Sequence, residues 1–129
     1  MRDILFRGKQ IEDGKWAEGF LSKDRDMSEH PAIPKIAIEW EVGGLLMRSF
    51  IDTATVGQYI GLTDKNGEKI FEGDIVKWND KLYEVAYITK YARFAGRRPR
   101  TVFSIFDLAR SEVIGNIHDN PELIDEERR

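Results

Sequence analysis

Cysteine is absent from the 129-residue sequence, which excludes disulfide bonds, thiolate zinc sites and cysteine nucleophiles. Long apolar runs are also lacking, and none approaches the roughly 20 residues that a membrane-spanning helix requires. The first residues, MRDILFRGKQ, interrupt their apolar run at Arg7, unlike a signal peptide. We therefore expect a soluble, cytoplasmic protein with no membrane association.

A strong net charge is lacking too. The chain carries 20 basic and 23 acidic residues, for a net charge of −3. Such a chain is no polycation that wraps duplex DNA with its whole surface, although a local basic patch remains open. Hydrophobic residues make up 41% of the sequence, which is enough for a modest core.

Helical periodicity is missing, since no segment sustains an apolar helical period over roughly ten to twelve residues. Turn signals instead recur about every ten residues, which is typical of short antiparallel strands. We predict a mostly β, β-dominated α+β fold with few short helical turns. An N-terminal β meander would occupy residues 1–56 and a small SH3-like barrel residues 57–129, unless both form one integrated unit. The barrel is an analogy with domains in which a Gly-Asp pair such as Gly73-Asp74 opens a strand.

Two-residue turn signals separate the alternating segments. They are Asp13-Gly14, Gly43-Gly44, Asn66-Gly67 and Asn79-Asp80. Asn-Gly predicts a type I′ hairpin turn. Residues 22–35 are polar and contain Pro31 and Pro34, so we predict a loop there. Residues 52–61 fit either a helical turn or a strand.

The stretch GLTDKNGEKIFEGDIVKW, residues 61–78, admits three interpretations. Its glycines and lysine fit a phosphate-binding loop poorly, because a strand pattern follows where that loop needs a helix. Asp64, Asn66 and Glu68 alternate like calcium ligands, but the glycine and glutamate that a calcium-binding EF-hand needs are missing. We favour a hairpin in which Gly73 adopts a positive φ angle and Asp74 bonds turn amides.

Catalytic and metal-binding patterns are weak. His30 and His118 lack further ligands at the spacing of a metal site. Glu72 and Asp74 form a carboxylate pair without a supporting histidine or arginine, which favours a structural role. We therefore predict no metal, no cofactor and no enzymatic activity.

A cluster of arginines and aromatic residues near the C-terminal end is the strongest candidate for binding. Its members are Tyr91, Arg93, Phe94, Arg97, Arg98, Arg100 and Phe103. Arginine forks suit phosphate groups and flat rings stack on unpaired bases, so the cluster predicts a nucleic-acid site on a basic loop, residues 95–100. Two alternatives stay open: a solvated hairpin tip, and a site for an acidic protein.

An ordered set of segments resembles one known family. The segments are ILFRGK, DGKWAEGFL, VGQYIGLTDKNGEKIFEGDIV and GNIHDNPEL. Together they are similar to the YopX family, small proteins of bacteriophages and prophages. The resemblance implies a mostly β protein with a barrel-like portion in a phage context, and it implies no activity and no site residue.

The sequence therefore supports two hypotheses. The first is a non-enzymatic phage or prophage accessory protein that acts as a binding or interaction module, with another protein or its own copy as partner. Exposed edge strands in such a fold favour a homo-oligomer. The second is a nucleic-acid-binding protein of phage replication or regulation that uses Arg93–Arg100.

Overall fold

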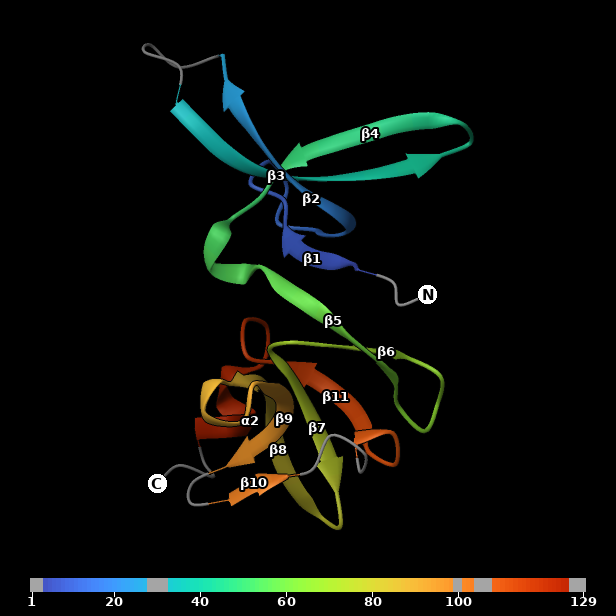
Figure 1. Ribbon diagram of the computed structural model, residues 1–129, viewed down its shortest axis with the longest axis vertical. Coiled ribbons are helices and arrows are strands. Elements are labelled where there is room, and N and C mark those ends of the chain that lie inside the picture. The colour runs from blue at the N-terminus through green and yellow to red at the C-terminus, as the bar shows by residue number, and fades with distance from the viewer. Residues whose placement is uncertain (1–3, 28–32, 99–100, 104–107, 126–129) are drawn as a thin grey trace. The chain divides into compact units, whose positions relative to one another are not determined.

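The computed structural model describes residues 4–27, 33–98, 101–103 and 108–125 (Figure 1). The chain divides into two compact units, Met1–Gln58 and Tyr59–Arg129. Apart from short helical turns, the described elements are antiparallel strands. The prediction of a mostly β fold is therefore confirmed.

Consecutive strands of the first unit pair with one another in the order β4-β3-β2-β1. Its elements are β1 (Phe6–Lys9), β2 (Trp16–Asp26), β3 (Ile33–Val42), β4 (Leu45–Phe50), the 3₁₀ turn η1 (Thr53–Thr55) and the start of β5 (Gly57–Thr63). The first residues of β5 return to β1, where Gly57 lies opposite Arg7. The first unit is thus a meander whose last strand pairs with its first.

The sheet of the first unit also curls until the end of β4 meets the end of β1. Gln10 bridges Ile51, and the Ile11 N–H donates to the Phe50 carbonyl at 3.0 Å. Glycine also allows β2 and β3 to pack closely, because a Cβ at Gly19 would collide with the backbone carbonyl of Glu39. The core inside the curl is small. It consists of Ala17, Ile38 and Ile51, with Phe6, Trp40 and Val56 packed against it.

The loop predicted over residues 22–35 is wrong at both ends, because β2 runs to Asp26 and β3 begins at Ile33. Pro34 lies opposite Arg25 of β2, and β4 reaches β3 only from Ala37 onward. At Pro34 the strand therefore has one neighbour, and a residue without an N–H is tolerated at such an edge. Pro31 lies outside the described residues.

Residues 52–61, which the sequence fitted to either a helical turn or a strand, contain both. Thr53–Thr55 form one 3₁₀ turn, and the Asp52 carboxylate accepts a hydrogen bond from the Ala54 N–H at 3.1 Å. Strand β5 follows from Gly57. A short turn thus leads directly into the strand within which the two units divide.

The second unit contains a five-stranded antiparallel sheet in the order β10-β9-β8-β7-β11 and a β5–β6 hairpin. The elements that follow β5 are β6 (Lys69–Phe71), β7 (Asp74–Trp78), β8 (Lys81–Ile88), η2 (Thr89–Tyr91), β9 (Arg93–Arg98), β10 (Thr101–Phe103), β11 (Glu112–Asn116) and α2 (Pro121–Asp125). Its buried core cluster is formed by Ile60, Ile70, Val76, Tyr83, Val85, Phe94 and Leu108. The SH3-like barrel stays a prediction.

Two hairpin turns have positive φ angles at both central residues, as a type I′ turn requires. Gly43 and Gly44 have φ angles of 56° and 82°, and Asn79 and Asp80 have 49° and 61°. The type I′ turn predicted at Asn66-Gly67 is wrong. The hairpin forms there, but Asn66 is not among the described residues with positive φ, whereas Gly67 is.

The turn before β7 has the predicted construction. Gly73 has a φ angle of 92°, a backbone conformation that residues with a side chain rarely adopt. The Asp74 carboxylate accepts a hydrogen bond from the Phe71 N–H at 2.7 Å, across the turn. Ile75 and Val76 then enter the sheet with no exposed surface. Both predictions for this turn are confirmed.

Candidate interaction surface

The predicted basic loop is a strand over most of its length, because Arg93–Arg98 form β9. Arg100 and the side chain of Phe103 lie outside the described residues. Successive side chains of a strand point to opposite faces, so Arg97 and Arg98 diverge. The cluster seen in the sequence is therefore divided between two faces of the sheet.

Intramolecular contacts engage three of the predicted residues. Arg97 lies opposite Glu84 of β8, and its guanidinium is 3.1 Å from that buried carboxylate. The Arg98 guanidinium lies 5.7 Å from the centre of the Tyr83 ring. Phe94 is only 8% exposed and belongs to the core. The packing of the sheet thus uses these side chains, and Phe94 presents little surface for base stacking.

Tyr91 and Arg93 do come together at the surface. The Arg93 guanidinium lies 5.3 Å from the centre of the Tyr91 ring, and the Lys90 ammonium lies 5.7 Å from it. Tyr91 is half exposed. The left-handed backbone of Ala92, with φ 50°, turns the chain between them. Lys90 was absent from the sequence prediction, because the η2 turn that brings it to Tyr91 has no clear sequence signal.

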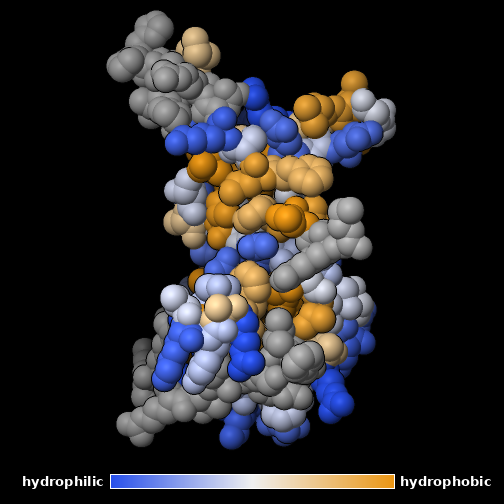
Figure 2. All heavy atoms as spheres, viewed as in Figure 1, coloured by the Kyte–Doolittle hydropathy of each residue, from blue (hydrophilic) through white to orange (hydrophobic). Residues whose placement is uncertain are grey.

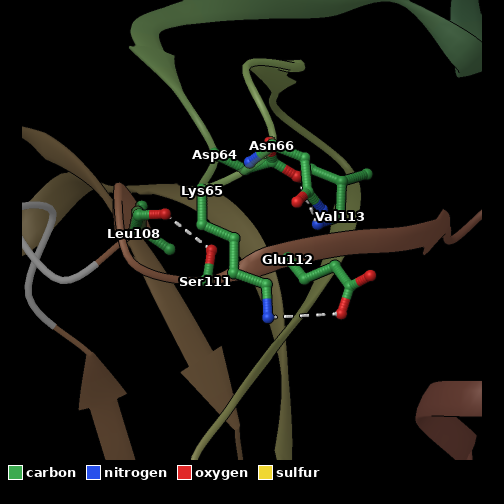
Figure 3. A network of polar contacts seen from close by, with 7 residues as sticks. All are labelled: Asp64, Lys65, Asn66, Leu108, Ser111, Glu112 and Val113. Atoms are coloured by element: carbon green, nitrogen blue, oxygen red, sulfur yellow. Dashed lines mark hydrogen bonds and ion pairs between the residues drawn. The ribbon is translucent and has the colours of Figure 1, made fainter.

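The carboxylate of Asp64, considered above as a calcium ligand, is used by the backbone instead (Figure 3). One oxygen accepts hydrogen bonds from the N–H groups of Asn66 at 2.8 Å and Glu68 at 2.9 Å. The other accepts from the N–H of Val113 at 2.9 Å. Desolvation alone would raise the pKa of Asp64, but these N–H groups and the nearby Lys65 ammonium outweigh it, so the pKa is lowered.

Lys65 adds a second connection between the same loop and the start of β11 (Figure 3). Its N–H donates to the Ser111 carbonyl at 3.0 Å, and its ammonium lies 3.7 Å from the Glu112 carboxylate. Across the described ranges, histidine and carboxylate side chains do not gather in groups of three or more that could hold a metal ion. The Asp64 loop is thus a structural joint between β5–β6 and β11.

The end of the β3–β4 hairpin extends beyond the strands that flank it (Figure 1). Strand β2 pairs with β3 only up to Glu39, because from Gly19 backward it pairs with β1. On the other side, β4 is joined by β1 only at Phe50 and Ile51. Residues 40–47, here called the arm, therefore form a two-stranded ribbon. In the described part of the chain, no further strand pairs with its edges.

The arm presents an apolar face. Trp40 lies opposite Met47, and Val42 lies opposite Leu45. All four point to the side of the sheet that carries the buried Ile38, since residues two apart in a strand share a face. Figure 2 shows apolar side chains gathered at the end of the arm.

The apolar side chains at the end of the arm are largely exposed. Val42 is 58% exposed, Leu45 68%, Leu46 71% and Met47 42%. The sequence carried a signal of this surface that the prediction did not use, because the apolar alternation of residues 36–42 continues to the turn without a polar residue replacing it. Hairpin tips are ordinarily polar.

Two comparisons relate the chain to known proteins. The sequence profile described as YopX protein matches residues 5–125. The chain belongs to the YopX family. Its similarity extends to a solved structure, the crystal structure of protein EF1440 from Enterococcus faecalis, with 26% sequence identity and a TM-score of 0.58. That likeness covers 96% of this chain and 99% of the other. No functionally curated protein matches the YopX-family chain.

Among the described residues, no helix has the length and apolar character needed to cross a bilayer.

Proposed function

We propose that this YopX-family protein is a phage or prophage accessory protein that binds another macromolecule in the bacterial cytoplasm and performs no chemistry of its own. The arm is the observation that carries the proposal. A two-stranded ribbon is marginally stable in water and needs a third strand or a packed face. Contiguous exposed apolar surface of this kind marks interaction sites. The arm therefore acts as a contact surface that a partner covers.

Six described polar residues are buried as whole residues, and they support a binding role over a catalytic one, because each of the six has a structural partner. Thr55, Ser111 and Asn116 bond the backbone within their own turns, Thr55 also accepts from the Lys9 N–H, Asp64 and Asp74 accept from backbone N–H groups, and Glu84 pairs with Arg97. Groups engaged in this way hold turns and strands in place. They have little freedom to exchange protons with a substrate.

Photocrosslinking in host cells tests the proposal. A photoreactive phenylalanine analogue replaces Leu46 in the arm, and in a matched control it replaces Phe20, which is 65% exposed on β2. We expect a covalent adduct of one defined mass from position 46 and none of that mass from position 20. If position 46 gives no adduct, or the same adducts as position 20, the arm is no contact surface and the proposal is wrong.

A nucleic-acid-binding protein of phage replication or regulation is the second candidate, and the exposed Tyr91–Arg93 pair favours it. A stacking ring beside a guanidinium and an ammonium suits single-stranded nucleic acid. Anisotropy of labelled single- and double-stranded DNA and RNA, at low and moderate salt, tests it. Binding should weaken with salt and in a Tyr91→Ala, Arg93→Ala double variant, but not in Lys23→Ala. No binding at low salt eliminates this candidate.

A further inference from the structure

We propose that the partner of the arm is the arm of a second copy of this chain, with the two β4 strands paired antiparallel about a two-fold axis. This inference rests on the proposed function and names its partner. Four strands, β3-β4 from each copy, would then form one continuous ribbon. Each arm would gain the third strand that a stable sheet needs.

The backbone of β4 has the polarity that this pairing requires. Just after β4, the Ile51 N–H donates inward, to the Ile36 carbonyl of β3, at 2.9 Å. The neighbouring Phe50 carbonyl accepts from Ile11 on the opposite side. Backbone groups alternate in direction along an antiparallel strand. The N–H and C=O of Leu46 therefore point to the outer edge of β4, where a second strand would bond them.

The register follows from the two-fold axis. An axis perpendicular to the sheet places one β4 residue opposite its own copy, and Leu46 at that position puts Leu45 opposite Met47 of the second copy. Residues that lie opposite each other in an antiparallel pair share a face. The apolar faces of both arms, with Trp40 and Val42 behind them, then form one stripe. An isologous contact of this kind closes as a dimer.

Charge favours a second copy over a foreign partner. Glu41 is the single charged residue of the arm, and it lies on the face opposite the stripe because it alternates with Trp40 and Val42. Arg48 is the single charge of β4, and in the Leu46 register it does not face its own copy. Edge strands that avoid pairing usually carry lysine, proline or inward charges. Residues 45–47 of this edge carry no such residue, and their uncharged apolar stripe best matches another one.

Sedimentation velocity of the full chain over a range of concentrations tests the dimer. We expect a species of twice the 14.9 kDa chain mass. Leu45→Lys should raise the dimer dissociation constant about 10-fold, because each dimer loses two apolar contacts between Leu45 of one copy and Met47 of the other. Phe20→Lys removes an equally exposed apolar residue from the other face and should leave the dissociation constant unchanged.

A second variant addresses the backbone pairing itself. Leu46→Pro removes an N–H that points away from β3, so the hairpin ladder keeps its bonds while the dimer loses one. It should also sediment as a monomer. The inference is wrong if the wild-type chain stays monomeric or forms a trimer. It is also wrong if both variants still dimerise as the wild type does. If the wild-type chain is monomeric while position 46 still crosslinks a different protein, the proposed function stands and only the self-pairing is wrong.

Discussion

Replacing Asp64 with asparagine tests the structural joint of the second unit. The side chain keeps its size, but its second oxygen becomes an NH₂ group. In the wild-type protein that oxygen accepts from the Val113 N–H at 2.9 Å, and Asp64 is only 5% exposed. In the variant, the new NH₂ group and the Val113 N–H, both hydrogen-bond donors, therefore face each other at a buried position. A hydrogen bond to a charged group contributes about 1.5–3 kcal/mol, and an unsatisfied buried donor costs about as much.

We therefore expect Asp64→Asn to lower the free energy of unfolding at pH 7 by about 2–4 kcal/mol. Because the pKa of Asp64 is lowered in the folded state, its carboxylate contributes stability above the unfolded-state pKa. That contribution is lost as the pH falls through the folded-state pKa. The difference between wild type and variant should accordingly shrink when the pH falls from neutral to below that folded-state pKa.

The free energy of unfolding is measured by urea unfolding, followed through the NMR signals of backbone amides in the second unit, such as that of Val85. Asp13→Asn is the matched control, because Asp13 accepts one hydrogen bond, from the Lys15 N–H, at an exposed turn. It should change the stability by less than about 0.5 kcal/mol. Equal stability of Asp64→Asn and wild type at pH 7, or a difference that does not change with acid, would refute the account of this joint.

Three further predictions can be checked by urea unfolding. Gly19→Ala should destabilise the first unit by about 1–3 kcal/mol, since its Cβ meets the Glu39 carbonyl, and a wild-type midpoint would show that β2 and β3 do not pack this closely. Ala92→Gly should stabilise the protein by up to about 1 kcal/mol, because glycine adopts the left-handed φ of 50° without strain; a loss of stability would contradict that geometry. A double-mutant cycle on Glu84→Gln and Arg97→Gln should give a coupling of about 0.5–1 kcal/mol, because the Arg97 side chain is 49% exposed, and no coupling would mean that the ion pair is absent in solution.

Local sequence signals predicted the turns well. Gly43-Gly44 and Asn79-Asp80 needed only residues that tolerate a positive φ, and Gly73-Asp74 combined such a residue with a carboxylate that reaches a nearby N–H. Asn66-Gly67 shows the limit of this reasoning. The Asp64 carboxylate also bonds Val113, forty-nine residues away, and that tertiary contact selects a longer loop than the dipeptide favours.

The candidate site depended on information that the sequence does not carry. Arg97 looked available until the strand register placed Glu84 opposite it. The arm looked like an ordinary alternating hairpin, because its exposure depends on where β2 leaves β3 for β1, at Gly19. Strand partners and register decide which side chains are covered, and they arise from packing between distant segments.

The exchange rate of the Leu46 backbone amide in the full chain tests the central claim, that a partner covers the arm, most directly. This N–H points to the outer edge of β4, so only an added strand can protect it. The self-pairing account predicts that hydrogen–deuterium exchange at Leu46 slows as the protein concentration rises, while exchange at Phe20 stays constant. Fast exchange at Leu46 at every concentration, and equally in extract of the host cell, would contradict the claim.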